Sequence, residues 1–351
     1  MNTYPMDRVF DFLELVLIEG KFYTIFSVLF GVGFSILLTR AQAKELVFHR
    51  FFLRRLFVLY LIGAAHAILF WHNDILQYYA LCGALLLPFV RVGNRTILAF
   101  AALALVIPAA ITLAGAIPAE FFTSPRDFLF HRFGFTSDTR VDDIAGGSFA
   151  QIVRLNLGNW FGQLDYVITS GWIFKIFGCF LLGFYLGRNE IHANLQSYRP
   201  IIKRLAVFGL AAGLPLNVIY AFAFSSESWL HTLSDTVSIL PLSVGYASLF
   251  CLIWISPSGP KLLHHFAPVG RMALTNYVGQ SVICTLIFYG TGLGLGGKMG
   301  PTLYLPIGFA VYLFQVIASR VWLNRFQFGP LEWLWRMLTY GIWIPLRKPA
   351  I

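Results

Sequence analysis

Residues 54–80, RRLFVLYLIGAAHAILFWHNDILQYYA, decide the class of fold. Two arginines precede an apolar run from Leu56 to Trp71, and a short polar turn separates it from a second apolar run that begins at Ile75. Such runs approach the roughly 20 residues that a helix needs to cross about 30 Å of hydrocarbon. The stretch therefore predicts a membrane hairpin. The one ionisable residue inside its first run, His66, is the first candidate for function.

The whole chain has the composition of a polytopic membrane protein. Of its 351 residues 58% are hydrophobic and 12% are charged, whereas a soluble domain has about 25% charged residues. The expected fold is an all-α transmembrane helical bundle with about nine spans. The expected spans are Phe22–Thr39, Leu56–Trp71, Ile75–Val90, Thr96–Pro118, Tyr166–Gly187, Leu205–Phe224, Thr236–Ile255, Ala273–Leu295 and Leu303–Val321.

Positive charge is unevenly distributed over the loops between these spans. If Arg40–Arg55 lies in the cytoplasm and the chain alternates, most of the 26 lysines and arginines fall on the cytoplasmic side. Such a bias sets the orientation of membrane proteins. We therefore expect a multi-pass protein of the cytoplasmic membrane with a cytoplasmic C-terminus. The net charge of +10 then requires no nucleic acid, and the expected partner is the lipid bilayer.

The chain divides into three expected parts. Residues 1–118 form an N-terminal membrane half, 119–165 an outer loop, and 166–351 a C-terminal membrane half. The loop ends in a helical apolar stripe, Phe149–Leu164, which lies flat on the membrane or packs as a lid on neighbouring helices. The C-terminal tail, with Trp333, Trp335, Trp343 and Arg336, is expected to form an interfacial helix rather than a tenth span.

The N-terminal 21 residues conflict with this topology. They would lie outside the membrane without a signal peptide, although Pro5–Glu19 has the apolar spacing of an amphipathic helix. A further span before Met1 would remove the conflict and make ten spans in all.

His66 is the main candidate for chemistry. It follows Leu56 by ten residues, or about 15 Å of helix, which places it near the bilayer midplane if the helix is straight. A neutral imidazole there can act as a general base or a proton relay. The alternative is a buried histidine that bonds to a neighbouring helix.

Asp74 and His72 are the groups that could assist His66. Asp74 precedes Ile75, where an N-cap carboxylate would satisfy backbone amides. The alternative is that Asp74 orients a histidine. Eight residues separate it from His66, about 12 Å if helical, so contact requires the helix to end or fold inward. His72 is the nearer partner in sequence.

The eighth expected span begins with a polar stripe. Asn276 and Gln280 are four residues apart, as are Tyr277 and Ser281, so they share one side of a helix. Such side chains bond helices together in membranes, or they form an entrance for a cytosolic ligand with a basic residue at its mouth. The expected substrate-binding residues are Arg54, Arg55, Arg271, Asn276, Tyr277, Gln280 and Ser281.

We expect no bound cofactor and no metal site. The four cysteines, Cys82, Cys179, Cys251 and Cys284, fall within spans and form no CxxC and no spaced pair with histidines. Lys175 also falls within an expected span.

Several motifs resemble those of the bacterial YeiB-like membrane proteins, which end in a domain of unknown function 418. The most specific are GRMALTNY at 270–277, followed by Gln280 and Ser281, and GPLEWLWR at 329–336. Further matching segments are 19–22, 26–33, 54–56, 63–66, 71–76, 79–80 and 182–188. Members of that family usually begin with one more span, which carries Arg-Gly and an Asn and is absent from this sequence.

The resemblance implies a protein of the bacterial cytoplasmic membrane and suggests a reaction class. The family is distantly similar to transmembrane acyltransferases, which pass an acyl group from cytosolic acyl-CoA to an acceptor on the far side. Such a likeness indicates no substrate. The reaction class leads us to expect acyl-CoA as a co-substrate beside Arg54, Arg55 and Arg271, and an acceptor on the outer side. The expectation that His66 is the base, assisted by Asp74 or His72, comes from its placement in the chain and not from the resemblance.

Two other functions remain open from the sequence. In a proton-coupled transporter of small solutes, His66, Asp74 and Lys175 would relay protons while Asn276 and Gln280 hold the solute. A non-catalytic membrane partner protein is the third. The sequence does not indicate the oligomeric state.

Overall fold

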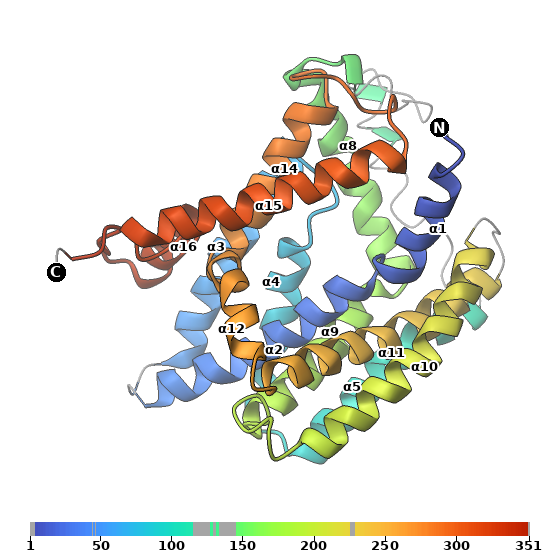
Figure 1. The fold of residues 1–351 in the computed structure, drawn as a ribbon. Helices are drawn as coiled ribbons and strands as arrows, with labels where there is room; N and C mark the ends of the chain where they lie inside the picture. Colours follow the sequence, from blue (N-terminus) through green and yellow to red (C-terminus); the bar gives the residue numbers. More distant parts are fainter. Residues whose placement is uncertain are drawn as a thin grey trace.

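The computed structural model describes residues 4–43, 45, 47–114, 127–128, 131–132, 145–224 and 229–349. This part of the chain is helical (Figure 1). In chain order the elements are α1 (Asp7–Leu17), α2 (Lys21–Gln42), α3 (Phe48–Leu69), α4 (Leu76–Ala84), η1 (Leu87–Arg91), α5 (Asn94–Ala114), α8 (Phe149–Thr169), α9 (Trp172–Arg188), α10 (Arg199–Ala223), α11 (Trp229–Trp254), α12 (Gly259–Leu263), η2 (His264–Phe266), α13 (Ala267–Arg271), α14 (Ala273–Phe288), α15 (Pro301–Arg325) and α16 (Pro330–Tyr340).

Most of each expected span is helical, which confirms a polytopic helical membrane protein. The bounds differ in places, because Tyr166–Gly187 crosses the break between α8 and α9, and Ala273–Leu295 continues past the end of α14 at Phe288. Six helical segments of the described chain are long and apolar enough to cross a membrane. The helices α4, α9 and α14 are shorter, with 9, 17 and 16 residues, against roughly 20 for a full crossing. The number of nine spans therefore stays a prediction, and the end of the fourth expected span, 115–118, lies outside the described residues.

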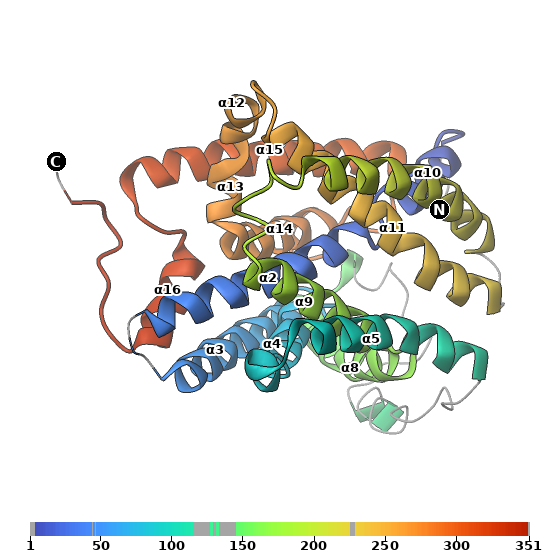
Figure 2. The same cartoon turned by 90° about the horizontal axis from the view of Figure 1, so that it is seen from below.

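The ends of the helices are sorted as the alternating topology requires. The α2–α3 connection and the C-terminus lie at one end of the molecule, on the left in Figures 1 and 2, and the N-terminus and the end of α10 lie at the other. Asn94 at the start of α5 donates to Asn189 after α9, at 2.9 Å. The start of α5 and the end of α9 therefore lie on the same side of the bundle. The assignment of that side to the cytoplasm stays a prediction.

Glycines bring α2 and α9 into close contact at the centre of the bundle, where Figure 2 shows both between the outer helices. A Cβ on Gly31 would overlap the backbone of Phe180, and a Cβ on Gly183 would overlap the backbone of Val28. Small residues permit this approach. Two of the motifs that carry the family resemblance, 26–33 and 182–188, thus specify helix packing.

The expected N-terminal amphipathic helix is present as α1, with its acidic side inward. The buried Asp7 accepts bonds at Oδ1 from the backbone N–H and the hydroxyl of Thr302, at 3.0 and 2.6 Å. Glu14 accepts the Tyr304 hydroxyl at 2.8 Å. The apolar residues Met6, Val9, Leu13 and Leu17 are exposed, as expected when lipid is the solvent.

The helix at the end of the long loop, α8, packs against α3, as the lid alternative expects, while its placement relative to the membrane surface stays a prediction. The Asn156 side chain donates to the Ile68 carbonyl at 3.3 Å, and Trp160 Nε1 donates to Gln77 at 3.0 Å. Most of the polar middle of the loop, which spans 136–147, lies outside the described residues, because the description resumes at 145.

The C-terminal tail forms the short helix α16 rather than a tenth span. Its 11 residues extend about 17 Å, well short of the hydrocarbon thickness. Gly341 ends the helix with φ 70°, a conformation that glycine adopts without strain.

Candidate active site at His66 and Asp74

The end of α3 determines where His66 lies. The helix begins at Phe48, earlier than expected, and ends at Leu69, so His66 is in its last turn, while its depth in the bilayer stays a prediction. The backbone N–H groups of Phe70 and Trp71 both bond to the His66 carbonyl, at 3.0 and 3.1 Å. This ends the helix, and the following turn brings the chain back toward His66.

His66 and Asp74 form a direct pair. His66 Nδ1 and Asp74 Oδ2 are 2.7 Å apart, and the two residues are only 2% and 1% exposed. A carboxylate can only accept, so Nδ1 carries the hydrogen. The inward fold that the sequence argument required is present, because the polar turn lies beyond the end of α3.

Asp74 fulfils both of the roles considered for it. Its Oδ1 accepts the backbone N–H of Gln77 at 3.1 Å, which caps the first turn of α4. Its Oδ2 also accepts the Tyr277 hydroxyl at 3.3 Å, while that hydroxyl accepts the Ile75 N–H at 3.4 Å. Three donors thus fix the carboxylate beside the imidazole.

The second imidazole nitrogen is the reactive candidate. In a neutral imidazole with hydrogen on Nδ1, Nε2 carries a lone pair. Nε2 is buried and has no hydrogen-bond partner among the described residues. The ring lies between Tyr277, with centroids 5.0 Å apart, and Phe70, at 6.3 Å. A neutral imidazole oriented by a carboxylate, with its acceptor nitrogen unbonded, is suited to general-base catalysis.

His72 lies apart from this pair. Asp74 bonds to His66 Nδ1, although His72 is the nearer residue in sequence. The contacts of His72 are with the ring of Trp71, at 5.2 Å, and with the Asn156 side chain. Burial lowers the pKa of His72, and the Asn156 hydrogen bond partly opposes that shift.

Two supporting residues gave no signal in the sequence. Gln77 Nε2 lies 3.4 Å from the Gly63 carbonyl, and its Oε1 accepts the Trp160 indole. Gln77 thus joins α3, α4 and α8 beside the pair.

His66 and Asp74 are also metal-ligand types, but in the described part of the chain no third His, Cys, Asp or Glu completes a metal site.

The three expected arginines occupy different places. The Arg55 guanidinium lies 3.6 Å over the Trp335 ring, and Trp335 Nε1 donates to the Arg55 carbonyl at 2.8 Å. Arg54 lies beside Gly341, also near α16. Arg271 instead lines a cavity between α13 and α15. The three arginines expected at one ligand entrance therefore lie in two places: Arg54 and Arg55 beside α16, and Arg271 between α13 and α15.

The polar stripe of α14 is also divided. Asn276 Nδ2 donates to Ser319 of α15 at 2.9 Å, and Gln315 donates to the Asn276 carbonyl at 2.7 Å. Asn276 therefore bonds helices together. Tyr277 alone reaches the His66–Asp74 pair, while Gln280 is exposed and Ser281 is half-buried.

The two most specific motifs meet at the start of α14. Glu332 accepts the backbone N–H groups of Leu274 and Thr275, at 2.7 and 3.0 Å, and the Thr275 hydroxyl at 2.5 Å. Because Trp335 bonds to α3 on the next turn, α16 connects the helix of His66 to the helix of Tyr277.

Fold and site together define a polytopic helical membrane protein with a buried histidine–aspartate pair. The family model described as "Protein of unknown function (DUF418)" matches residues 186–342. The chain is 33% identical over 341 residues to the "Uncharacterized protein YxaH" of Bacillus subtilis (strain 168), covering 94% of this chain and 82% of that protein. It is 30% identical over 341 residues to the "Uncharacterized protein YeiB" of Escherichia coli (strain K12), covering 93% and 83%.

The chain therefore belongs to the DUF418 family, and the resemblance to YeiB-like proteins that its motifs indicated is confirmed. No solved structure matches it.

Proposed function

We propose that this protein is a membrane-bound acyltransferase, which moves an acyl group from cytosolic acyl-CoA to an acceptor that arrives from the outer side. The observation that supports the proposal most is the buried His66–Asp74 pair with an unbonded Nε2. The distant likeness of YeiB-like proteins to transmembrane acyltransferases supports the choice of reaction.

The proposed reaction is direct transfer. His66 Nε2 takes the proton from an acceptor hydroxyl or amine as that atom forms a bond to the thioester carbonyl carbon. The carbon–sulfur bond then breaks, and the coenzyme A thiolate leaves and takes the proton back from Nε2. Asp74 holds the Nδ1–H and stabilises the transient imidazolium, as an aspartate does in a catalytic triad. Positioned bases of this kind contribute about 10²–10⁴-fold to rate.

Tyr277 connects this centre to the donor side. It lies six residues after Arg271, where we propose that acyl-CoA approaches. Arg54 and Arg55 contribute on that side by holding α16 against α3. The turn between α3 and α4, covered by α8, is where the acceptor would arrive.

A transporter would use the same ionisable residues differently. It would need Asn276 to hold a solute, whereas this side chain is bonded to Ser319. Lys175, which a transporter would also use, is buried on α9 with Nζ 5.8 Å from the Tyr23 ring centroid, a placement that does not distinguish the two functions. The geometry therefore favours acyl transfer. A non-catalytic partner protein, the third possibility, would have no need of a buried histidine whose Nε2 is left without a hydrogen bond.

The test is thiol release from acyl-CoA by the purified full chain in detergent, with a panel of hydroxyl and amine acceptors. We expect turnover without a sealed membrane, and a loss of at least about 100-fold in His66→Gln with acyl-CoA thermal shifts near wild type. The control is His49→Gln, an exposed histidine at the start of the same helix. Full turnover in His66→Gln, or solute uptake in sealed vesicles without thiol release, would overturn the proposal.

A further inference from the structure

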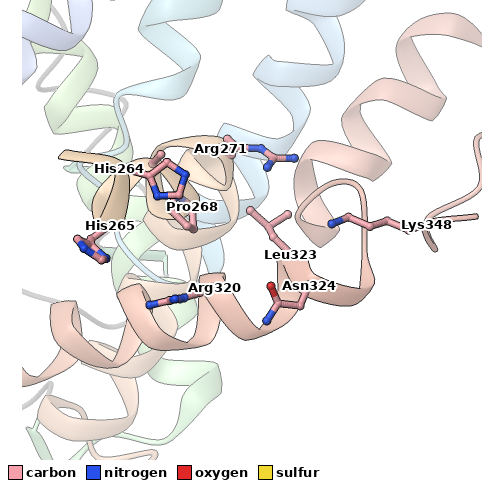
Figure 3. Close-up of a pocket in the computed structure, with 9 residues that line it drawn as sticks. His264, His265, Pro268, Arg271, Arg320, Leu323, Asn324 and Lys348 are labelled. Carbon is pink, nitrogen blue, oxygen red and sulfur yellow. The ribbon is translucent and has the colours of Figure 1, made fainter. Parts of the chain in front are cut away.

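A basic cavity of about 330 Å³ lies beside α13, apart from the His66–Asp74 pair. Figure 3 shows the side chains around it, which come from three segments: η2–α13, the end of α15 and the C-terminal tail. Its polar lining consists of His264, His265, Arg271, Arg320, Asn324 and Lys348. The volume falls within the range of small-molecule sites.

Backbone hydrogen bonds hold the tail at this cavity. Gln327 N–H donates to the Leu346 carbonyl at 2.9 Å, and Lys348 N–H donates to the Arg325 carbonyl at 3.1 Å. The Gln327 side chain donates to the Arg347 carbonyl at 2.9 Å. The tail is thus paired with the chain that leaves α15, and Lys348 is positioned at the cavity by main-chain geometry.

The other two cations are also placed by ordered structure. Arg320 and Asn324 are four residues apart, so they share one side of α15, with the buried Leu323 between them in the lining. Arg271 ends α13 and donates to the Gln327 carbonyl at 3.4 Å. Three chain segments therefore bring one cation each to a single cavity.

The charge of the lining indicates its ligand. Arg271, Arg320 and Lys348 are cationic and exposed, and none of the described residues that line the cavity is acidic. Three positive charges around one cavity repel one another, and a bound anion would offset this repulsion. Guanidinium groups offer two parallel donors to phosphate oxygens, and an ammonium offers a point charge.

We infer that this cavity binds a phosphate group of a ligand at the side of the membrane where the C-terminus lies. The inference does not require acyl transfer, because the phosphate could belong to a soluble phosphorylated molecule, including the acyl-CoA proposed to approach Arg271, or to a phospholipid headgroup of the adjacent leaflet. Both share the anionic chemistry that the lining would recognise.

The experiment has two arms, both with the full chain in nonionic detergent. One arm titrates inorganic pyrophosphate by calorimetry, and the other measures quenching by labelled phosphatidylglycerol in micelles. The variants are Arg271→Gln, Arg320→Gln and Lys348→Gln. The matched control is Arg325→Gln, which removes the same charge from an exposed position on α15 outside the cavity lining. Thermal unfolding identifies any variant that fails to fold.

We expect saturable binding in at least one arm, weakened about tenfold or more by each cavity variant, weakened by added salt, and unchanged by Arg325→Gln. Binding of pyrophosphate alone assigns a soluble ligand, and binding of phosphatidylglycerol alone assigns a lipid. No binding in either arm, or equal weakening by Arg325→Gln, would overturn the inference. Phosphate binding should be unchanged in His66→Gln, which leaves the cavity intact, and thiol release by that variant tests the His66 chemistry separately.

Discussion

Gly63 leaves the space that the carboxylate of Asp74 occupies. A Cβ at position 63 would lie 2.6 Å from Asp74 Oδ1 and 2.9 Å from the Gln77 backbone nitrogen. The His66–Asp74 pair therefore depends on the absence of a side chain one turn earlier on α3. This gives a physical reason for the glycine of the Gly63–His66 motif.

Gly63→Ala tests that relationship. The added methyl group should displace Asp74 and cost about 1–3 kcal/mol in the free energy of unfolding, as overpacking does, and reduce thiol release to the level of an Asp74 variant. The control is Gly33→Ala on α2, where a Cβ meets nothing within 4 Å, so alanine should stabilise that helix slightly. Wild-type turnover in Gly63→Ala would contradict the tight fit.

Asp74→Asn tests two roles of Asp74 separately: orienting His66 and capping the first turn of α4. The asparagine oxygen can still accept the Gln77 N–H, but its amide nitrogen replaces the acceptor of the His66 Nδ1–H and the Tyr277 hydroxyl, so thermal stability should fall, though less than in Asp74→Ala. The lost charge no longer stabilises an imidazolium. We expect the kcat of thiol release to fall by about 10²–10⁴-fold with a small change in KM. Asp74→Ala should lose both activity and stability. A wild-type kcat in Asp74→Asn would remove Asp74 from the mechanism.

Glu332→Ala should destabilise the protein without changing the chemistry of the histidine. The substitution leaves the N–H groups of Leu274 and Thr275 without their acceptor, at a cost of about 1–3 kcal/mol. Glu332→Gln keeps one acceptor oxygen and should restore part of the loss. Thermal unfolding in detergent measures both. Equal stability of all three proteins would show that α16 does not hold α14.

Low pH should destabilise the fold through His72. Because burial lowers its pKa below 6.5 in the folded protein, the unfolded chain takes up the proton first. The stability that neutral His72 provides is full above pH 6.5 and is lost as pH falls through the lower folded value. We expect His72→Gln to reduce the fall in Tm between pH 7.5 and about 5.5, and the exposed control His192→Gln to leave it unchanged.

Orientation can be tested by labelling single introduced cysteines. Cysteines at Gln42 and Ser258 should react with a membrane-impermeant reagent only after permeabilisation, because the Lys/Arg bias places them in the cytoplasm. A cysteine at Ser226 should react in intact cells. Reaction at Gln42 in intact cells would reverse the orientation and with it the side on which acyl-CoA is proposed to enter.

Hydrophobic runs located the helices well, because apolar length is a property of local sequence. The same signal misplaced the end of α3, since Phe70 and Trp71 are apolar and continue the run past the last helical residue, Leu69. The expected start, Leu56, was also too late, because α3 begins at Phe48, and His66 therefore lies in the last turn of a longer helix than expected. The polar turn at 72–74 was the better indicator of where the helix ends.

Contacts between distant segments had no local signal. Tyr277 was one of several residues in a polar stripe, and nothing in its spacing singled out the one that bonds to Asp74. Glu332 and Trp335 indicated only an interfacial helix, although the structure places them against α14 and α3. Gln77 and Trp160 carry no pattern that links them.

The helix α16 has a consequence for the order in which the protein assembles during synthesis. His66 and Asp74 are eight positions apart, so their pair can form as soon as the first hairpin leaves the ribosome. Trp335 and Arg55 are 280 positions apart, and this contact closes only when translation is nearly complete. A nascent chain thus carries an oriented histidine long before the last helix joins α3 to α14 and completes the surroundings of that histidine.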